Sequence, residues 1–236
     1  MSELLAVRGL NAWYGRAQVL FDIDLRVDAG EVVTLLGRNG AGKTTTLAAV
    51  MGLIPGVRGD VHFGGASISG LPPHRIARLG IGYVPEDRRV FSDLTVDENL
   101  AVGRQPPRPG APSWTPQALF DLFPNLAELR RRRAGQMSGG EQQMLTIART
   151  LMGHPSLVLL DEPSEGLAPR LVEQLARALG TMKAEGLTIL VSEQNPRFAR
   201  SLTDRAYVIE KGRTRFEGTL ADLDARPDIR DACLAV

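Results

Sequence analysis

The sequence is poor in cysteine, in long apolar runs and in net charge. Its single cysteine, Cys233, excludes an internal disulfide framework and a metal site made of cysteines alone, and it fits a reducing compartment. No apolar run approaches the roughly 18 residues that a membrane helix needs, so work at a membrane would require another protein to span it. The segment Met1 to Leu5 has no basic stretch followed by an apolar one, and we expect no signal peptide. The formal net charge of +1 argues against a sequence-independent nucleic-acid binder.

What is present indicates an ordinary soluble globular protein. The 236 residues allow one domain or a core with a lobe, and 43% of them are hydrophobic, enough for a substantial core. Apolar runs at 157–160 and 187–191 alternate with segments of helical periodicity, which predicts an α/β fold with a parallel sheet. Residues 19–27 alternate between apolar and polar types. They predict a half-buried antiparallel strand with Phe21 on its apolar side, paired with residues 4–7.

The middle third predicts a helical lobe inserted into this core. Thr95 and Glu98 have capping-box spacing, and Thr115 begins a second predicted helix after a proline-rich loop. The run from Arg130 to Arg133 could be a nucleic-acid contact, but at this net charge it favours a solvated helix end or an anion-facing patch.

The stretch from Gly37 to Thr45 matches the phosphate-binding pattern G-x-x-x-x-G-K-[ST]. A predicted buried strand at 31–36 precedes it and a helical pattern at 45–51 follows, in the order that this loop requires. Its glycines let backbone N–H groups point at a polyphosphate, and the helix adds the positive end of its dipole. Lys43 would reach the terminal phosphates and Thr44 would hold Mg²⁺. The alternative is a glycine-rich turn before a helix, but the setting favours a nucleoside triphosphate.

Two further segments carry candidate chemistry. Asp161 and Glu162 follow the apolar run 157–160, at the strand end where parallel sheets bind ligands. Asp161 can hold Mg²⁺ through its water shell and Glu162 can polarise a water, although the pair could also be a polar strand end. Ser138 and Glu141 have capping-box spacing, which indicates a helix start. The glycines behind Ser138 would also let that helix end press against a phosphate, and both interpretations stay open.

The order of these motifs resembles that of the ATP-binding subunits of ABC transporters. The likeness is carried by the P-loop, by the signature segment Ser138–Gln142 and by the continuous stretch 157–167. It covers essentially the whole chain. The segments 82–91 and 191–195 resemble in particular the second, shorter ATPase subunit of branched-chain amino-acid importers of the hydrophobic amino-acid uptake type.

This resemblance implies an α/β fold with a defined division. The expected fold is a P-loop NTPase (RecA-like) core with a mostly parallel sheet, an N-terminal antiparallel β-subdomain and an inserted helical subdomain. Residues 1–236 would be a single ABC ATPase domain. Residues 1–87 and 154–236 would form the nucleotide-binding core with its antiparallel β-subdomain, and residues 88–153 the helical subdomain with the signature motif.

The resemblance also implies a site for ATP and Mg²⁺. The residues expected to bind the nucleotide are Tyr14, Gly37, Asn39, Gly40, Gly42, Lys43, Thr44, Thr45, Glu86, Ser138, Gly139, Gly140 and Asp161. The expected metal site consists of Thr44, Glu86 and Asp161, and the expected catalytic residues are Glu162, as base, and Gln194. Tyr14 would stack on adenine, or else be a half-buried core aromatic. Ser138 and Gly140 would contact the γ-phosphate held by the opposite subunit, and residues 164–167 would cross that interface.

Two positions depart from the general pattern of the family. Glu86 stands where a glutamine is usual, and Gln194 stands where a histidine usually contacts the γ-phosphate. Glu86 can still offer an oxygen toward Mg²⁺ or its water, with an added negative charge. Gln194 donates a hydrogen bond but carries no proton at neutral pH. If the histidine contributes by positioning, glutamine can replace it; if it contributes charge, hydrolysis should be slower.

The implied function is an ATPase that powers branched-chain amino-acid import as a peripheral protein at the cytoplasmic face of the inner membrane. The implied partners are two membrane permease subunits, a second ATPase subunit in an ATP-sandwich dimer, and indirectly a periplasmic or extracellular substrate-binding protein, with no nucleic acid. A paralogue is favoured over a second copy, and the permeases should dock near 86–94. The alternatives are urea or amide import, lipid or lipopolysaccharide export, and a soluble ABC ATPase acting on DNA or ribosomes.

Overall fold

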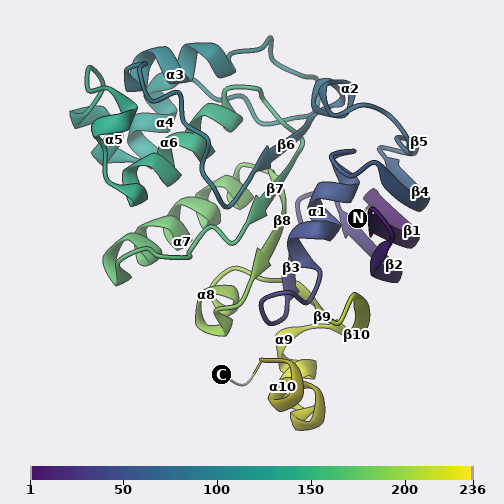
Figure 1. The fold of residues 1–236 in the computed structure, drawn as a ribbon. Helices are drawn as coiled ribbons and strands as arrows, with labels where there is room; N and C mark the ends of the chain where they lie inside the picture. Colours follow the sequence, from purple (N-terminus) through teal and green to yellow (C-terminus); the bar gives the residue numbers. More distant parts are fainter. Residues whose placement is uncertain (1, 235–236) are drawn as a thin grey trace.

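The computed structural model describes residues 2–234 and arranges them as two sheets with helices around them (Figure 1). The side chains of 231–234, and with them that of Cys233, lie outside the described part. The first sheet is antiparallel, with the strand order β2-β1-β4-β5. Its strands are β1 (Glu3–Tyr14), β2 (Ala17–Asp28), β4 (Gly56–Phe63) and β5 (Ala66–Ser67).

The second sheet is mostly parallel, with the strand order β10-β9-β3-β8-β7-β6. Its strands are β3 (Val32–Leu36), β6 (Ile81–Val84), β7 (Leu157–Asp161), β8 (Thr188–Glu193), β9 (Arg205–Glu210) and β10 (Arg213–Gly218). Only β10 runs antiparallel to its neighbour. The mixed α/β fold with a separate antiparallel sheet is the one expected from the sequence.

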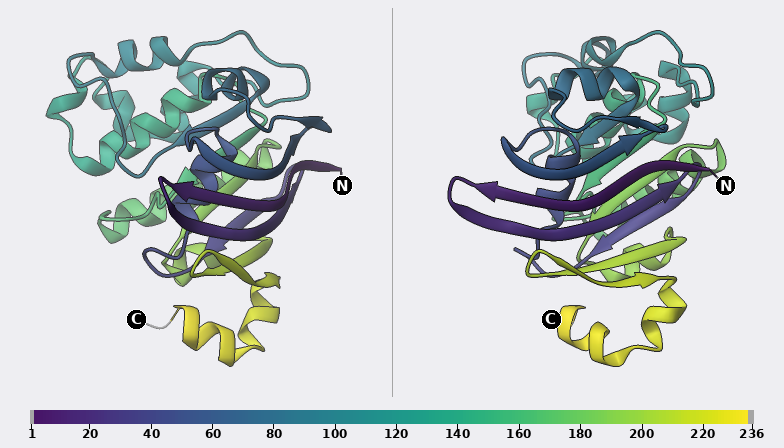
Figure 2. Two further views of the ribbon diagram at one scale, coloured as in Figure 1. Left: turned by 45° about the vertical axis from the view of Figure 1, so that its right-hand side comes forward. Right: turned by 90° about the vertical axis from the view of Figure 1, so that its right-hand side faces the viewer.

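Every residue of β3 and β7 is buried, because the parallel sheet is covered on both faces. Successive side chains of a strand point to opposite faces. Leu157 and Leu159 of β7 therefore pack in one core with the antiparallel sheet and α1 (Lys43–Val50). Val158 and Leu160 pack in a second core with α6 (Gly139–Leu151) and α7 (Pro169–Ala184). Helix α1 lies between the two sheets (Figures 1 and 2).

A lobe of helices lies to one side of the parallel sheet, at the upper left of Figure 1. It consists of α3 (Val96–Gly103), α4 (Pro116–Leu122), α5 (Pro124–Glu128), the 3₁₀ turn Ala134–Gln136 and α6. The remaining helices are α2 (Pro73–Leu79), α8 (Pro196–Arg200), α9 (Leu220–Asp224) and α10 (Pro227–Leu234). In the lobe, α3 begins with a capping box between Thr95 and Glu98, as the sequence predicts.

The N-terminal hairpin differs from the expected alternation at one place. The pairing Leu10 with Ile23 is followed by Ala12 with Leu20, so β2 contains one more residue than β1 over this interval. This is a β-bulge, and Asp22 at its centre has a φ of 50°. The extra residue shifts the alternation of β2 by one position, so that the side chains before the bulge point to the opposite face of the sheet. Leu20 is therefore fully buried, whereas Phe21, which was expected on the apolar side, is only half-buried.

A buried ionic network joins the two sheets at the outer strands. The Arg205 guanidinium binds both carboxylate oxygens of Glu31, at 2.8 and 2.9 Å, and also donates to the Tyr207 hydroxyl at 2.8 Å. The same group reaches the Arg26 carbonyl of β2 at 3.0 Å and Glu217 of β10 at 2.7 Å. Burial raises the pKa of Tyr207 to about 12, so the hydroxyl stays neutral and can also accept from the Arg26 N–H.

Candidate phosphate-binding site

The P-loop occupies the turn between β3, which ends at Leu36, and α1, which begins at Lys43. Gly42 precedes the helix with a φ of 113°, a conformation that residues with a side chain rarely adopt. A Cβ at this position would also lie 2.8 Å from Cδ2 of Leu20. Glycine meets both conditions. The bulge turns Leu20 inward to a place beside Gly42 where a larger residue would leave it less room.

Lys43 is bound inside its own loop and to the end of β7. Its side chain is buried, with 3% of the residue exposed. The ammonium Nζ donates to the carbonyls of Gly37 at 2.8 Å and Arg38 at 3.1 Å, and it forms an ion pair with Oε1 of Glu162 at 3.0 Å. The loop carbonyls hold the side chain along the loop. The cation is thereby placed where the P-loop meets the acidic strand end.

Asp161 accepts hydrogen bonds from three hydroxyl groups on three elements. Oδ1 accepts from Thr44 Oγ1 at 2.9 Å and from Ser192 Oγ at 2.7 Å, and Oδ2 accepts from the Tyr83 hydroxyl at 3.2 Å. Burial, and next the Asp161 charge, raise the pKa of Tyr83, so this hydroxyl remains a donor. The cluster fits Mg²⁺, since that ion is bound through one or two carboxylates and hydroxyls together with substrate phosphates.

Glu162 follows Asp161 and has a left-handed backbone with a φ of 45°. Such a conformation is costly for a residue with a side chain and persists where the surroundings fix it. Here the Glu162 N–H donates to both the carbonyl, at 3.1 Å, and the hydroxyl, at 3.0 Å, of Ser192. The carboxylate accepts from Gln194 Nε2 at 2.5 Å as well as from Lys43. Gln194 therefore lies directly on the predicted base.

The surroundings of Glu162 decide its charge. Burial raises the pKa of this carboxyl, but the hydrogen bonds from Gln194 and Lys43 outweigh burial, and the pKa lies below its ordinary value. The hydrogen bond between the Glu162 and Glu165 carboxyls instead raises the pKa of Glu165. Burial raises the pKa of Glu193. Glu162 thus favours the ionised form more than Glu165 and Glu193 do, and its carboxylate can accept a hydrogen bond from water.

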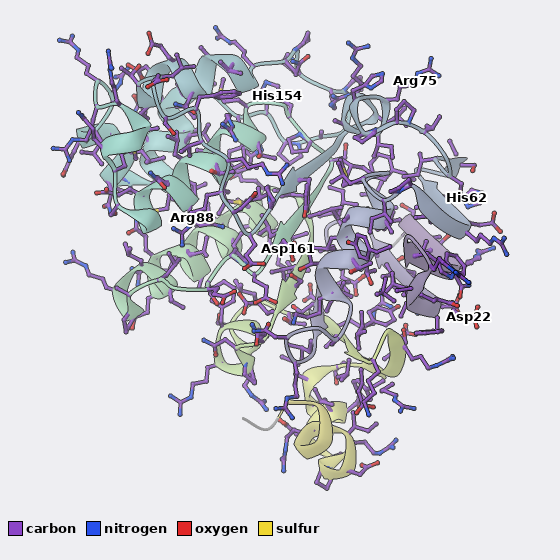
Figure 3. The ribbon with its side chains drawn as sticks, viewed as in Figure 1. Asp22, His62, Arg75, Arg88, His154 and Asp161 are labelled. Atoms are coloured by element: carbon purple, nitrogen blue, oxygen red, sulfur yellow. The ribbon has the colours of Figure 1, made fainter. Side chains whose placement is uncertain are left out.

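A cavity of about 380 Å³ opens between these elements. It is lined by Val19, Asn39, Gly40, Gly42, Lys43, Thr44, Thr45, Glu86, Glu162 and Glu165. All but Val19 and Glu165 are residues that the sequence predicted. Three further predicted residues bind residues that line the cavity. Gly37 accepts from Lys43, Asp161 accepts from Thr44, and Gln194 donates to Glu162. Figure 3 labels Asp161 near the centre of the molecule, at the end of the parallel sheet.

The other predicted residues lie outside that cavity. Tyr14 is the last residue of β1, and 53% of it is exposed, so it is not a core aromatic. Ser138 caps α6, with its backbone N–H and hydroxyl both bonded to Glu141, and Gly139 and Gly140 form the first turn. None of these four predicted residues lines the phosphate cavity within the described part of the chain.

Three contacts of the site were not predicted. Tyr83, Ser192 and Glu165 touch the acidic pair. They lie in the segments 82–91, 191–195 and 157–167 that carry the family resemblance, but none was expected to contact Asp161 or Glu162. Ser192 had a usable signal, because it follows a buried apolar run that pairs with the strand of Asp161. Parallel neighbours meet at the same edge of the sheet, so their last residues face one another. Knowledge of the strand order was needed to use that signal.

Two larger cavities lie elsewhere on the protein. One of about 740 Å³ separates α4 and α5 from α7, and one of about 630 Å³ separates α2 and β6 from α3 and α6. Among the residues that the structure describes, no group of three or more His, Cys, Asp or Glu side chains is placed to hold a metal. None of the helices in that same part of the chain is long and apolar enough to cross a bilayer.

A family model described as ABC transporter matches residues 20–165, which include the P-loop, the signature segment and the acidic pair. Two curated relatives match over almost the full length of the chain. The high-affinity branched-chain amino acid transport ATP-binding protein BraG of Pseudomonas aeruginosa is 45% identical and is covered to 99%, with 98% of this chain aligned. The probable branched-chain amino acid transport ATP-binding protein LivF of Archaeoglobus fulgidus is 35% identical, with 96% of this chain and 97% of that protein covered.

The fold is likewise that of a solved protein. The ADP conformation of MJ1267, an ATP-binding cassette of an ABC transporter, superposes with a TM-score of 0.83 and 25% sequence identity. The match covers 98% of each chain. It therefore includes both sheets and the helical lobe.

Proposed function

The chain belongs to the ATP-binding subunits of ABC transporters, a family of ATPases, and from that premise we propose that it powers the import of branched-chain amino acids. The observation that carries the ATPase chemistry is the meeting of Lys43 and Thr44 of the P-loop with Asp161 and Glu162 in one cavity. The cargo class is supported by the full-length similarity to BraG and LivF.

The predicted nucleotide-binding residues have proposed parts in holding MgATP. The P-loop N–H groups and the start of α1 bind the phosphates, and Lys43 exchanges its contact with Glu162 for phosphate oxygens. Thr44, Asp161 and Glu86 hold the metal and its water. Mg²⁺ neutralises negative charge on the phosphates when it is bound. Tyr14, exposed at the end of β1, offers its ring to the adenine.

Hydrolysis is proposed to depend on Glu162 and Gln194. The ionised Glu162 accepts a hydrogen bond from the attacking water and orients it toward the γ-phosphate. Gln194 donates to the same carboxylate at 2.5 Å and fixes its rotamer, a role that needs a donor but no titratable proton. This arrangement supports the positioning explanation for the glutamine that replaces the usual histidine.

The position of the signature segment supports an ATP-sandwich dimer. Ser138, Gly139 and Gly140 lie at the open end of α6 and outside the cavity of their own chain. We propose that they receive the γ-phosphate of ATP held by a second ATPase subunit, a paralogue rather than a second copy. Each chain would then supply two different half-sites. The division into a core of 1–87 and 154–236 and a lobe of 88–153 is proposed on the same basis.

The groove of about 630 Å³ is the proposed docking place for the two permeases. Large apolar side chains are exposed along it, namely Leu53, Phe91 and Val102. Phe91 lies within the segment 86–94, which begins at the phosphate cavity. Docking there would place the chain on the cytoplasmic face of the membrane, and a periplasmic or extracellular binding protein would act on the permeases from the other side.

The test is affinity purification of the tagged chain from detergent-solubilised membranes of its source, followed by uptake of radiolabelled leucine, isoleucine and valine. We expect two permeases and a second ATPase to co-purify, and we expect deletion of the gene to abolish uptake. Co-purification of the same set with urea or amide uptake would replace the cargo. Recovery with outer-membrane export components, ribosomes or DNA would overturn import.

A further inference from the structure

The loop after β6 has an unusual backbone at two adjacent arginines. Arg88 and Arg89 have φ values of 63° and 45°, both in the left-handed region that side chains disfavour. Two residues of α6, one turn apart, hold this loop. Thr146 donates its hydroxyl to the Arg88 carbonyl at 2.5 Å, and Arg149 donates to the Arg89 carbonyl at 2.7 Å. The signature helix therefore fixes the strained loop and the direction of its side chains.

The side chain of Arg88 is directed at the glycines of the signature segment. A Cβ built on Gly139 would lie 2.3 Å from Nη1 of Arg88, so the guanidinium packs directly on the bare backbone of that residue. A Cβ on Gly166, in the loop before α7, would lie 3.7 Å from Nη2. In Figure 3 Arg88 is labelled between the helical lobe and α7. Its guanidinium thus joins the signature segment to the loop expected to cross the dimer interface.

Arg88 is half-buried, and its guanidinium has no anionic partner in the described part of the chain. Among the side chains that the structure describes, none forms an ion pair or a hydrogen bond with it, whereas the neighbouring Arg89 pairs with Asp87 at 2.8 Å. It also lies at the N-terminal end of a 13-residue helix, where the backbone itself is electropositive. The nearby Glu141 carboxylate is bound to Ser138 in the capping box. The guanidinium of Arg88 and the N-terminal end of α6 together place positive charge at one point, and an anion bound there would stabilise it.

We propose that Arg88 is a further catalytic residue, supplying positive charge in trans to the γ-phosphate of ATP held by the second ATPase subunit. The proposal rests on the proposed function, because the anion that reaches this end of α6 is the nucleotide of the opposite half-site. It goes further in giving a role to Arg88, which lies in the segment 82–91 but is not among the expected site residues. Arg88 of this chain would thus act on the partner's nucleotide and leave its own cavity unaffected.

The experiment compares three variants of the purified transporter complex. Arg88→Gln removes the charge and keeps donors, Arg88→Lys keeps the charge, and Arg89→Gln is the matched control on the same loop. Each complex is labelled with a photoreactive azido-ATP, and labelling is measured separately on the two ATPase subunits. If the second subunit is a copy, a size tag on the variant copy separates the two bands.

Arg88→Gln should raise the ATP concentration for half-maximal labelling of the opposite subunit by about tenfold to a hundredfold, the range for a hydrogen bond to a charged group. Labelling of the variant subunit should stay unchanged. Arg88→Lys should recover part of the loss, and Arg89→Gln should match the wild type.

Equal labelling of wild type and Arg88→Gln would overturn the proposal. So would an equal loss on both subunits, or an equal loss in Arg89→Gln, because these results would indicate a structural role for the loop. A wild-type complex that hydrolyses no ATP or contains no second ATPase would instead remove the proposed function on which the inference rests.

Discussion

The phosphate cavity and the N-terminal end of α6, where the signature segment lies, differ in whether their polar groups find partners within the chain. In the cavity the polar groups satisfy one another, since Lys43, Asp161 and Glu162 each have several partners within the chain. At the signature end the helix has its cap, but Gly139 is bare and Arg88 lacks a partner among the described side chains. The cavity is thus complete within one chain, and the other end depends on a second subunit.

The largest expected effect separates chemistry from binding within the complete half-site. Glu162→Gln keeps the size of the side chain and one acceptor oxygen for the donors Lys43 and Gln194, but it removes the negative charge that orients the water. We expect kcat to fall by about 100-fold or more, in the range for loss of a general base, with ATP binding retained. Phosphate release and equilibrium binding of a fluorescent ATP analogue would measure the two quantities. An unchanged hydrolysis rate would remove Glu162 from the reaction.

Lys43→Ala should act on binding itself. Lys43 is the only side-chain cation that lines the cavity among the residues that the structure describes, and its removal also leaves the buried Glu162 without its ion pair. ATP affinity should fall by about tenfold to a hundredfold, as expected for one lost hydrogen bond to a charged group. Equilibrium binding measures this loss. If Lys43→Ala and Glu162→Gln weakened ATP binding equally, the division of roles between them would be wrong.

A pair of glycine substitutions compares the two regions directly. Gly42→Ala must adopt a φ of 113° and meets Leu20, so we expect a loss of about 1–2 kcal/mol in the free energy of unfolding. In Gly140→Ala the new methyl meets the ends of two half-buried side chains, Leu171 and Leu167, which can shift more easily than the fully buried Leu20. Alanine also favours a helix over glycine, so the stability should change by less than about 1 kcal/mol. Denaturant unfolding measures both, and a larger loss for Gly140→Ala would reverse the comparison.

The smallest expected effect is a loss of stability in weak acid, which we expect to come from His154, just after α6, and not from Glu162 in the phosphate cavity. Glu162 stays ionised because its pKa is lowered, whereas burial, and next the charge of Arg108, lower the pKa of His154 near the far end of α6. Below about pH 6.5, the ordinary pKa of histidine, the unfolded chain binds a proton that folded His154 resists. Stability should therefore fall as the pH drops from about 6.5.

The matched variant for this effect is His154→Asn. Asparagine places an acceptor oxygen where Nδ1 of His154 accepts from the Trp114 N–H at 3.0 Å, and it tolerates the φ of 47° at this position. Urea unfolding at pH 7.5 and at pH 5.5 should show a smaller loss for the variant than for the wild type. Parallel losses in the two proteins would exclude His154 as a source of the acid sensitivity.

Local patterns were enough to predict a large part of the fold. The P-loop, the capping boxes at Thr95 and Ser138 and the buried strands β3, β7 and β8 each follow from a spacing that a few neighbouring residues determine. The bulge at Asp22 was missed, because it accompanies a contact between Leu20 and Gly42, two residues that are distant in the sequence. The contact of Arg88 with Gly139 was missed for the same reason, since it depends on how the loop and α6 are placed.

The network around Arg205 has a consequence for how the protein comes apart. The Arg205 guanidinium pairs with Glu31, just before β3, and with Glu217 of β10 within the parallel sheet, and it also donates to the Arg26 carbonyl of β2. Separating the two sheets therefore breaks a hydrogen bond from a charged group. The helical lobe has no such link to the antiparallel sheet among the described residues. In native-state hydrogen exchange the two sheets should therefore open as one cooperative unit, at a higher free energy than the lobe.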